Sequence, residues 1–114
     1  MYRYFLSKRN RLLNVDEFDF VFQKSNRIKV TGMILLSRPN RLKFPRIGLA
    51  ISKKCIRFAH ERNRVKRYAR ETFRIYQHVL SSSDFVLIIR SKSVLCLSNE
   101  ILIKELQKLW KNHF

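Results

Sequence analysis

The stretch that decides the fold runs from Arg46 to Arg90 and reads RIGLAISKKCIRFAHERNRVKRYARETFRIYQHVLSSSDFVLIIR. Its beginning, Arg46 to Ser52, alternates branched apolar residues with small ones, which predicts a β-strand with one face of small side chains. Its end, Phe85 to Arg90, is apolar on both faces, which is typical of a strand inside a sheet. Between them, Ala59 to about Val79 has the periodicity of a long amphipathic helix. The stretch therefore predicts a strand–helix–strand unit.

The sequence before this unit adds a helix and a strand. Asn14 and Glu17 have the spacing of a capping box, which predicts a short helix from Val15 to about Lys24. The segment Arg27 to Ser37 is rich in Ile, Val and Leu and is read as a strand, with Gly32 as the candidate position for a break.

The remaining segments are read as connections and a final helix. We expect a turn at Arg38–Arg41, a basic connection at Lys53–Phe58, a loop at Ser81–Asp84 and a connection at Ser91–Leu97. Ser98 or Asn99 caps a last helix that reaches Lys111, with its apolar side formed by Leu102, Ile103, Leu106, Leu109 and Trp110. This order predicts a single domain over residues 1–114, an α/β (α+β) two-layer sandwich of one sheet covered by helices.

Composition limits the function classes. The 114 residues carry a formal net charge of +17, which favours a polyanionic partner and nucleic acid above all. Hydrophobic residues make up 46% of the chain, enough for one core, so disorder is not expected. The longest apolar run, Phe85–Ile89, is far shorter than the roughly 20 residues of a membrane-spanning helix, so no membrane partner is expected. The first residues lack the apolar run of a signal peptide, so we expect a cytoplasmic location.

The basic residues concentrate on the long helix. On a helical projection of residues 62–74 (RNRVKRYARETFR), the apolar side collects Val65, Tyr68, Ala69, Thr72 and Phe73, and Tyr76 continues it two residues further on. The opposite side collects Asn63, Lys66, Arg67, Arg70 and Arg74, flanked by Arg62 and Arg64. Guanidinium groups match phosphate oxygens in pairs, so this face is a candidate RNA-binding surface. Asn63 could contact phosphate or be a plain surface residue, and the pattern leaves both open. Lys53, Lys54 and Arg57 are candidates to extend this surface, and Lys8, Arg9 and Arg11 form a further basic patch near the N-terminus.

Aromatic residues are the second feature. Phe18, Val21 and Phe22 have i, i+3, i+4 spacing on the first helix. Such spacing is usually core, but nine Phe and four Tyr in a small basic chain also suit the stacking of unpaired bases. The spacing alone leaves both readings open.

Catalytic and metal-binding patterns are missing from the sequence. Cys55 and Cys96 lie far apart and are read as free thiols. Asp16, Glu17 and Asp19 are the one acidic cluster, which suits a helix N-terminus, and the three histidines show no paired spacing. We therefore expect no catalytic residue and no metal ligand in this chain.

An ordered set of segments resembles the protein subunit of bacterial ribonuclease P, in its proteobacterial form. The segments are PRIGLAISKKCIRFAHERNRVKRYARETFR (45–74), KRNRLLNVDEFDFVFQ (8–23), DFVLIIR (84–90) and LQKLWKNH (106–113). The resemblance implies a mostly antiparallel central sheet with a left-handed β-α-β crossover. It also implies a ribonucleoprotein endoribonuclease that removes the 5′ leader of precursor tRNA, with catalysis and Mg²⁺ on the RNA subunit and none on this chain.

The family's functional positions carry over onto residues of this chain. Contact with the RNA subunit is implied for Lys53, Lys54, Arg62, Asn63, Arg64, Lys66, Arg67 and Arg70, and a cleft for the single-stranded leader is implied at Phe18 and Phe22. Arg9, Arg11 and Arg46 match basic positions nearby, while Ser93 departs from the glycine common in relatives. The implied role is to aid substrate binding and to lower the Mg²⁺ requirement. The alternative is a non-enzymatic basic RNA-binding module of another ribonucleoprotein, which would bind RNA without stimulating cleavage.

Overall fold

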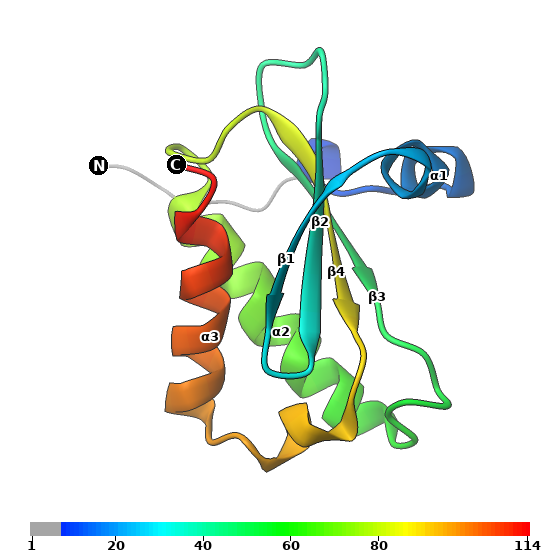
Figure 1. The fold of residues 1–114 in the computed structure, drawn as a ribbon, viewed down its shortest axis with the longest axis vertical. Helices are drawn as coiled ribbons and strands as arrows, with labels where there is room; N and C mark the ends of the chain where they lie inside the picture. The colour runs from blue at the N-terminus through cyan, green and yellow to red at the C-terminus, as the bar shows by residue number, and fades with distance from the viewer. Residues whose placement is uncertain (1–7) are drawn as a thin grey trace.

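A computed structural model describes residues 8–114, so the N-terminal run used for the expectation about signal peptides lies, for its greater part, outside the described residues. Four strands form one sheet in the order β1-β2-β4-β3, with bounds β1 (Asn26–Val30), β2 (Met33–Pro39), β3 (Arg46–Ala50) and β4 (Ser83–Ile89). The helices are α1 (Val15–Gln23), α2 (Ala59–Tyr76) and α3 (Asn99–Lys111), with short 3₁₀ turns at Lys8–Asn10 and Lys92–Cys96 (Figure 1).

The expected strand from Arg27 to Ser37 is a hairpin of two antiparallel strands, β1 and β2, in which Val30 pairs with Met33. The chain reverses at Thr31–Gly32, and Gly32 has a φ of 70°, a conformation that L side chains rarely adopt. A Cβ at this position would lie 2.7 Å from Cγ2 of Val94. The candidate break at Gly32 is therefore a complete reversal that only glycine fits.

Two expected connections are partly strand. Ser83 and Asp84 were assigned to a loop but open β4, where they pair with Pro39 and Arg38 of β2. Arg38 and Pro39, expected in a turn, therefore belong to β2. The loop prediction was wrong at these two residues, because the side chain of Asp84 is buried in an ion pair with Arg46 that no local pattern encodes.

The strand–helix–strand unit is present as expected. β3 pairs in parallel with β4, and α2 connects them, so the sheet is mostly antiparallel with one parallel crossover. α2 ends at Tyr76, three residues before the expected end, and β3 ends at Ala50, two residues early. β4 lies between β2 and β3, which confirms the interior position predicted from its apolar faces.

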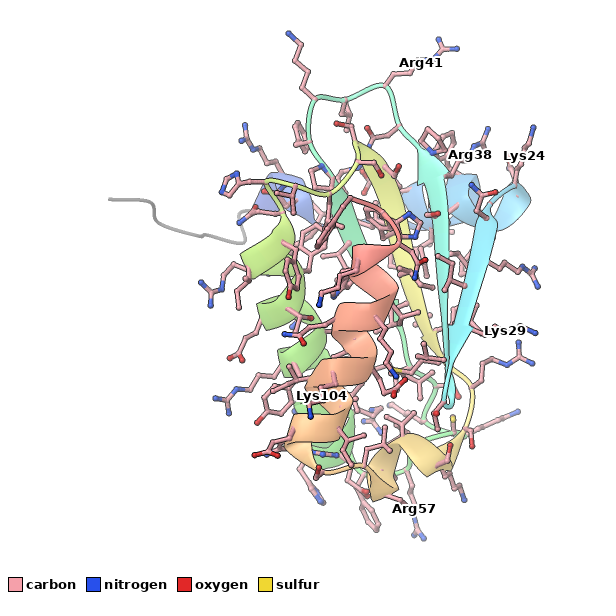
Figure 2. The ribbon with its side chains drawn as sticks, turned by 60° about the vertical axis from the view of Figure 1, so that its left-hand side comes forward. Lys24, Lys29, Arg38, Arg41, Arg57 and Lys104 are labelled. Carbon is pink, nitrogen blue, oxygen red and sulfur yellow. The ribbon has the colours of Figure 1, made fainter. Side chains whose placement is uncertain are left out.

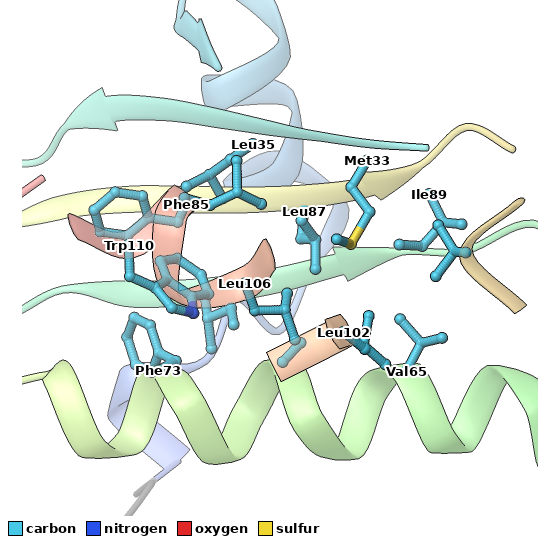
Figure 3. Packing of buried hydrophobic residues seen from close by; sticks show 14 of the residues in the cluster. Met33, Leu35, Val65, Phe73, Phe85, Leu87, Ile89, Leu102, Leu106 and Trp110 are labelled. Carbon is cyan, nitrogen blue, oxygen red and sulfur yellow. The ribbon is translucent and has the colours of Figure 1, made fainter. Parts of the chain in front are cut away.

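Two helices cover one face of the sheet. Figure 2, which brings α3 forward, shows α2 and α3 side by side on this face. Figure 3 shows Phe73 of α2, Phe85 of β4 and Trp110 of α3 meeting edge to face, with ring centroids 5.5–6.4 Å apart. The buried indole Nε1–H of Trp110 donates to Oγ1 of Thr72 at 2.8 Å, so its polar atom is satisfied. These contacts fix the apolar side of α2 against the sheet. The position of the basic face on the other side of α2 is thereby fixed too.

The short helix α1 lies on the other face of the sheet (Figure 1). Val21 is fully buried against Ile34, Leu36 and Val86, which alternate with the residues that face α2 and α3. The expected capping box is confirmed, since Asn14 Oδ1 accepts from the amide of Glu17 at 3.0 Å and Glu17 accepts from the amide of Asn14. The two-layer packing thus holds for α2 and α3, and α1 is added on the opposite side.

Within residues 8–114, none of the helices has the length and apolar character needed to cross a membrane.

The imidazole of His113 predicts a pH dependence of stability. Its ring packs edge-on against the ring of Phe85, with the two centroids 4.9 Å apart, and its buried Nε2 has no hydrogen-bond partner. Burial lowers the pKa of His113 below its ordinary value of 6.5. The unfolded chain therefore binds a proton before the folded chain does, so stability falls as the pH drops below about 6.5. We expect the urea midpoint to be lower at pH 5.5 than at pH 7.5. The His113→Phe variant should lose part of this difference, and an unchanged difference would contradict the prediction.

Candidate RNA interface

A groove runs between α1 and β3, on the sheet face that α1 leaves partly open. One cavity of about 720 Å³ is lined by Phe22, Ala50, Ser52 and Arg90 among others. A second cavity of about 240 Å³ includes Phe18 and Gly48 in its lining. Leu49 lines both, so the two cavities follow each other along β3. We call them together the α1–β3 groove.

The rings of Phe18 and Phe22 form one wall of the α1–β3 groove. They stack on each other with centroids 6.4 Å apart, and Phe22 is 47% exposed. The exposed ring of Phe22 belongs to the groove rather than to the core, while Phe18 is half-buried and packs beside Leu12 and Gly48. Phe22 is therefore not a core residue, and base stacking by either ring stays a prediction.

The small residues of β3 make room for these rings. An added Cβ at Gly48 would lie 2.6 Å from two atoms of the Phe18 ring, so the ring lies directly on the strand backbone. Ala50 comes two residues later on the same face and lines the cavity beneath Phe22. The alternation of small residues noted in the sequence therefore shapes the groove.

Cations from three other segments also line the α1–β3 groove. Lys66 and Arg70, one turn apart on α2, line it together with Arg11, which precedes α1. Arg90, just beyond β4, lines the other cavity. The structure thus brings the basic helix and the aromatic cleft into one surface. Sequence reasoning missed Arg90 because a single basic residue after a strand carries no pattern.

The connection before α2 presents further exposed groups. Lys53, Lys54 and Arg57 are all exposed, and Arg57 projects outward in Figure 2. Phe58, which sequence reasoning also missed, is 51% exposed and stacks on His60 with centroids 5.8 Å apart. It occupies the N-cap of α2 without a side-chain cap, a position where Ser, Thr, Asp or Asn is preferred. The signal in the sequence was a phenylalanine, in place of a capping residue, directly before the helix.

Two arginines of the predicted motif hold the protein itself together. Nη1 of Arg62 donates to the carbonyls of Ile56 and Arg57, at 2.8 and 2.9 Å, which fixes the connection before α2. Arg64 donates to the carbonyl of Leu97 and to Oδ1 of Asn99, tying α2 to the start of α3. Both arginines therefore position the basic surface, whatever further contacts they make.

The other predicted residues lie at separate places. Asn63 is exposed on α2, and Arg67 is exposed and pairs with Glu71 at 3.2 Å. Arg74 is half-buried near the end of α2. The guanidinium of Arg9 lies 4.9 Å from the ring centroid of Phe44, away from the lining of the groove.

Arg46, matched in the sequence to a basic position near the RNA-facing surfaces, is tied into the fold by two carboxylates. Its Nε and Nη2 donate to the two oxygens of Asp84, at 2.8 and 2.5 Å, and its Nη1 pairs with Glu17. The hydrogen bond to Asp84 is the main cause that raises the pKa of Arg46 above its ordinary value. Three of its five N–H groups donate to two carboxylates, which join α1 to the sheet, and a contact between Arg46 and RNA stays a prediction.

Among residues 8–114, no three His, Cys, Asp or Glu side chains gather in a way that could hold a metal ion. What the described part of the chain does offer is an aromatic groove with cationic walls, next to a basic helix. Unpaired bases stack on such rings, and phosphates pair with such cations. The fold and the groove together define a small α+β RNA-binding protein.

Comparisons with known proteins agree with this class. Residues 6–113 match the family model described as Ribonuclease P. The chain is 62% identical over 113 residues to the ribonuclease P protein component of Blochmanniella pennsylvanica, covering 99% of this chain and 98% of the relative. It is 48% identical to that of Yersinia enterocolitica, covering 90% and 86%. The RNase P protein from Thermotoga maritima has a TM-score of 0.79 at 26% identity, covering 91% and 97%.

The chain belongs to the ribonuclease P protein family, as its resemblance to the proteobacterial members implied. The family provides the protein component of ribonuclease P, an endoribonuclease that processes the 5′ end of precursor tRNA. Its partners are accordingly the ribonuclease P RNA and the tRNA substrate. The alternative of an RNA-binding module from another ribonucleoprotein is thereby set aside.

Proposed function

We propose that this chain holds the single-stranded 5′ leader of precursor tRNA in the α1–β3 groove and contacts the RNA subunit through the exposed side of α2. The observation that carries the proposal is the shared lining of the groove. Phe18 comes from α1, whereas Lys66 and Arg70 come from α2. One surface thus reaches from the aromatic wall to the basic helix that faces the RNA subunit.

The groove suits a strand of any sequence. The rings of Phe18 and Phe22 offer stacking faces that every base can use, and the cations offer phosphate contacts. Four cations line the groove, namely Arg11, Lys66, Arg70 and Arg90. If each contacts one phosphate, log K for the leader falls with log salt at a slope of about −3. Leader binding should therefore be sensitive to salt and weakly selective for sequence.

The cleavage chemistry is assigned to the RNA subunit, with Mg²⁺ held on RNA. The formal charge of +17 gives the chain its own part in the reaction. It screens the repulsion between the RNA subunit and the precursor, which would otherwise require more Mg²⁺.

Reconstitution tests the proposed function. The protein, a bacterial ribonuclease P RNA and a precursor tRNA are mixed at low Mg²⁺, with controls that lack each component. We expect leader release from the complete mixture and from neither the protein nor the RNA alone. Cleavage by the protein alone would contradict the assignment of chemistry to RNA. A folded protein that binds RNA without stimulating release would contradict its role as a subunit.

Replacing Phe22 tests the leader groove separately. Since its ring is 47% exposed, its removal should leave the fold intact. Stacking of one base on an aromatic ring contributes about 1–3 kcal/mol, so Phe22→Ala should weaken leader binding by about tenfold. Phe22→Leu keeps an apolar side chain without a ring and should lose a similar amount, whereas Phe22→Tyr should keep the affinity. Equal affinities for all three variants, measured by titration of a labelled precursor, would remove Phe22 from the site.

A further inference from the structure

The flank of α1 that faces away from the α1–β3 groove carries a second pair of cavities. The larger, of about 540 Å³, is lined by Phe20, Arg38 and Arg41 among others. The smaller, of about 230 Å³, includes Lys24 and Arg38 in its lining. Arg38 and Pro39 line both, so the two cavities adjoin. We call them together the Phe20–Arg38 pocket, and its larger cavity lies within the usual 300–1,000 Å³ of ligand sites.

Arg38 is held as a planar platform in this pocket. Its guanidinium lies 3.7 Å from the centroid of the Phe20 ring, and its Nη1 donates to the carbonyl of Phe20 at 2.6 Å. The side chain is half-buried, so its conformation is fixed before any ligand arrives. A guanidinium plane of this kind stacks on nucleobases and carries a positive charge at the same time.

Positively charged side chains outnumber negatively charged ones around the pocket. Asp84 lines the larger cavity, but both its oxygens accept hydrogen bonds from Arg46 and one also accepts from Asn40. Lys24 and Arg41 are exposed, and no ion pair within residues 8–114 includes either of them or Arg38. Figure 2 shows Lys24, Arg38 and Arg41 at the same end of the molecule. The pocket thus combines a stacking plane with cations that have no acidic partner.

We propose that the Phe20–Arg38 pocket binds an unpaired nucleotide of the RNA subunit. Its base stacks beside the Phe20–Arg38 pair, and its flanking phosphates pair with Lys24 and Arg41. The leader is not the occupant, because it is placed in the α1–β3 groove, whose lining shares no residue with that of the Phe20–Arg38 pocket. The proposal rests on the proposed function only for the identity of the RNA partner.

The test compares two double variants that each remove two exposed cations. Lys24→Ala with Arg41→Ala removes the charges of the pocket, and Lys29→Ala with Lys104→Ala removes charges outside both cavities (Figure 2). We expect the pocket variant to weaken binding to the RNA subunit at least tenfold, and the control to weaken it less than threefold. Arg38→Lys, which keeps the charge and loses the plane, should also weaken it. The urea midpoint of each variant checks the fold.

A second arm identifies the source of the nucleotide. Each variant is assembled with saturating RNA subunit, and its affinity for precursor tRNA is measured. We expect wild-type affinity in this arm. A loss confined to the precursor arm would overturn the RNA subunit as the occupant, and equal effects of the two double variants would overturn the pocket as a site. Neither outcome affects the reconstitution test, in which the wild-type protein and the RNA subunit release the leader together.

Discussion

Replacing Gly48 with alanine should weaken holoenzyme binding to a precursor tRNA with a single-stranded leader by well over tenfold. The added Cβ would lie 2.6 Å from two ring atoms of Phe18 and 2.9 Å from Cδ1 of Leu12. Real Cβ atoms do not come so close, so the ring must leave the strand and enter the groove. The variant thereby removes the stack between Phe18 and Phe22 and fills the part of the groove proposed for the bases. We expect the loss of leader affinity to be larger than that from removing one ring.

The leader itself supplies the control for the Gly48 variant. Binding of mature tRNA, which has no leader, should change less than twofold, and so should assembly with the RNA subunit. We also expect the overpacking to cost about 1–3 kcal/mol of folding stability. An equal loss for precursor and mature tRNA would mean that the substitution acts through the fold as a whole. Unchanged binding of the precursor would show that the position of Phe18 does not matter for the leader.

Replacing Asp84 with asparagine should produce the largest loss of stability. The carboxylate is fully buried and accepts hydrogen bonds from Arg46 and Asn40. Removing its charge leaves the half-buried guanidinium of Arg46 with Glu17 as its one remaining acidic partner. Breaking a buried pair in this way costs about 3–5 kcal/mol, which urea unfolding would measure. Because Arg46 also links Glu17 of α1 to β4, leader binding should fall with stability.

A surface ion pair serves as the matched control for Asp84. Glu71→Gln removes the partner of Arg67 on the exposed side of α2, and exposed pairs contribute less than about 1 kcal/mol. We expect the two substitutions to differ by several kcal/mol. Replacing Arg46 and Asp84 together with apolar residues should restore part of the stability, because no buried charge is then left unpaired. Similar unfolding free energies for Asp84→Asn and Glu71→Gln would contradict the structural role of the Arg46–Asp84 pair.

The features that could be predicted from the sequence are encoded over a few residues. The capping box of Asn14 and Glu17, the apolar stripe of α2 and the interior character of β4 each follow from a spacing of two to four positions. The basic face of α2 was predicted from the same periodicity. Helix α3 was predicted well too, since Ser98 caps it and it ends at Lys111. Local backbone geometry determines all of these, so no tertiary information is needed.

The composition of the functional surface depends on contacts between distant segments. The sequence shows three alternating small residues but not that Phe18 lies on Gly48, 30 positions away. It shows a row of arginines but not that Arg62 and Arg64 hold backbone carbonyls while Lys66 and Arg70 line the groove. It shows Arg46 as one more basic residue and Asp84 as part of a loop, but not that the two form a buried pair.

The difference has one physical origin. A helical or strand pattern sets which side of an element is apolar, because its period is fixed by backbone geometry. Which element meets that side depends on how all the elements pack together, and that packing decides whether a charged group is desolvated. The sequence by itself determined the helices, the interior strand and the basic, RNA-binding character of this protein. Only the tertiary structure decided which of its cations line the groove and which are bound within the fold.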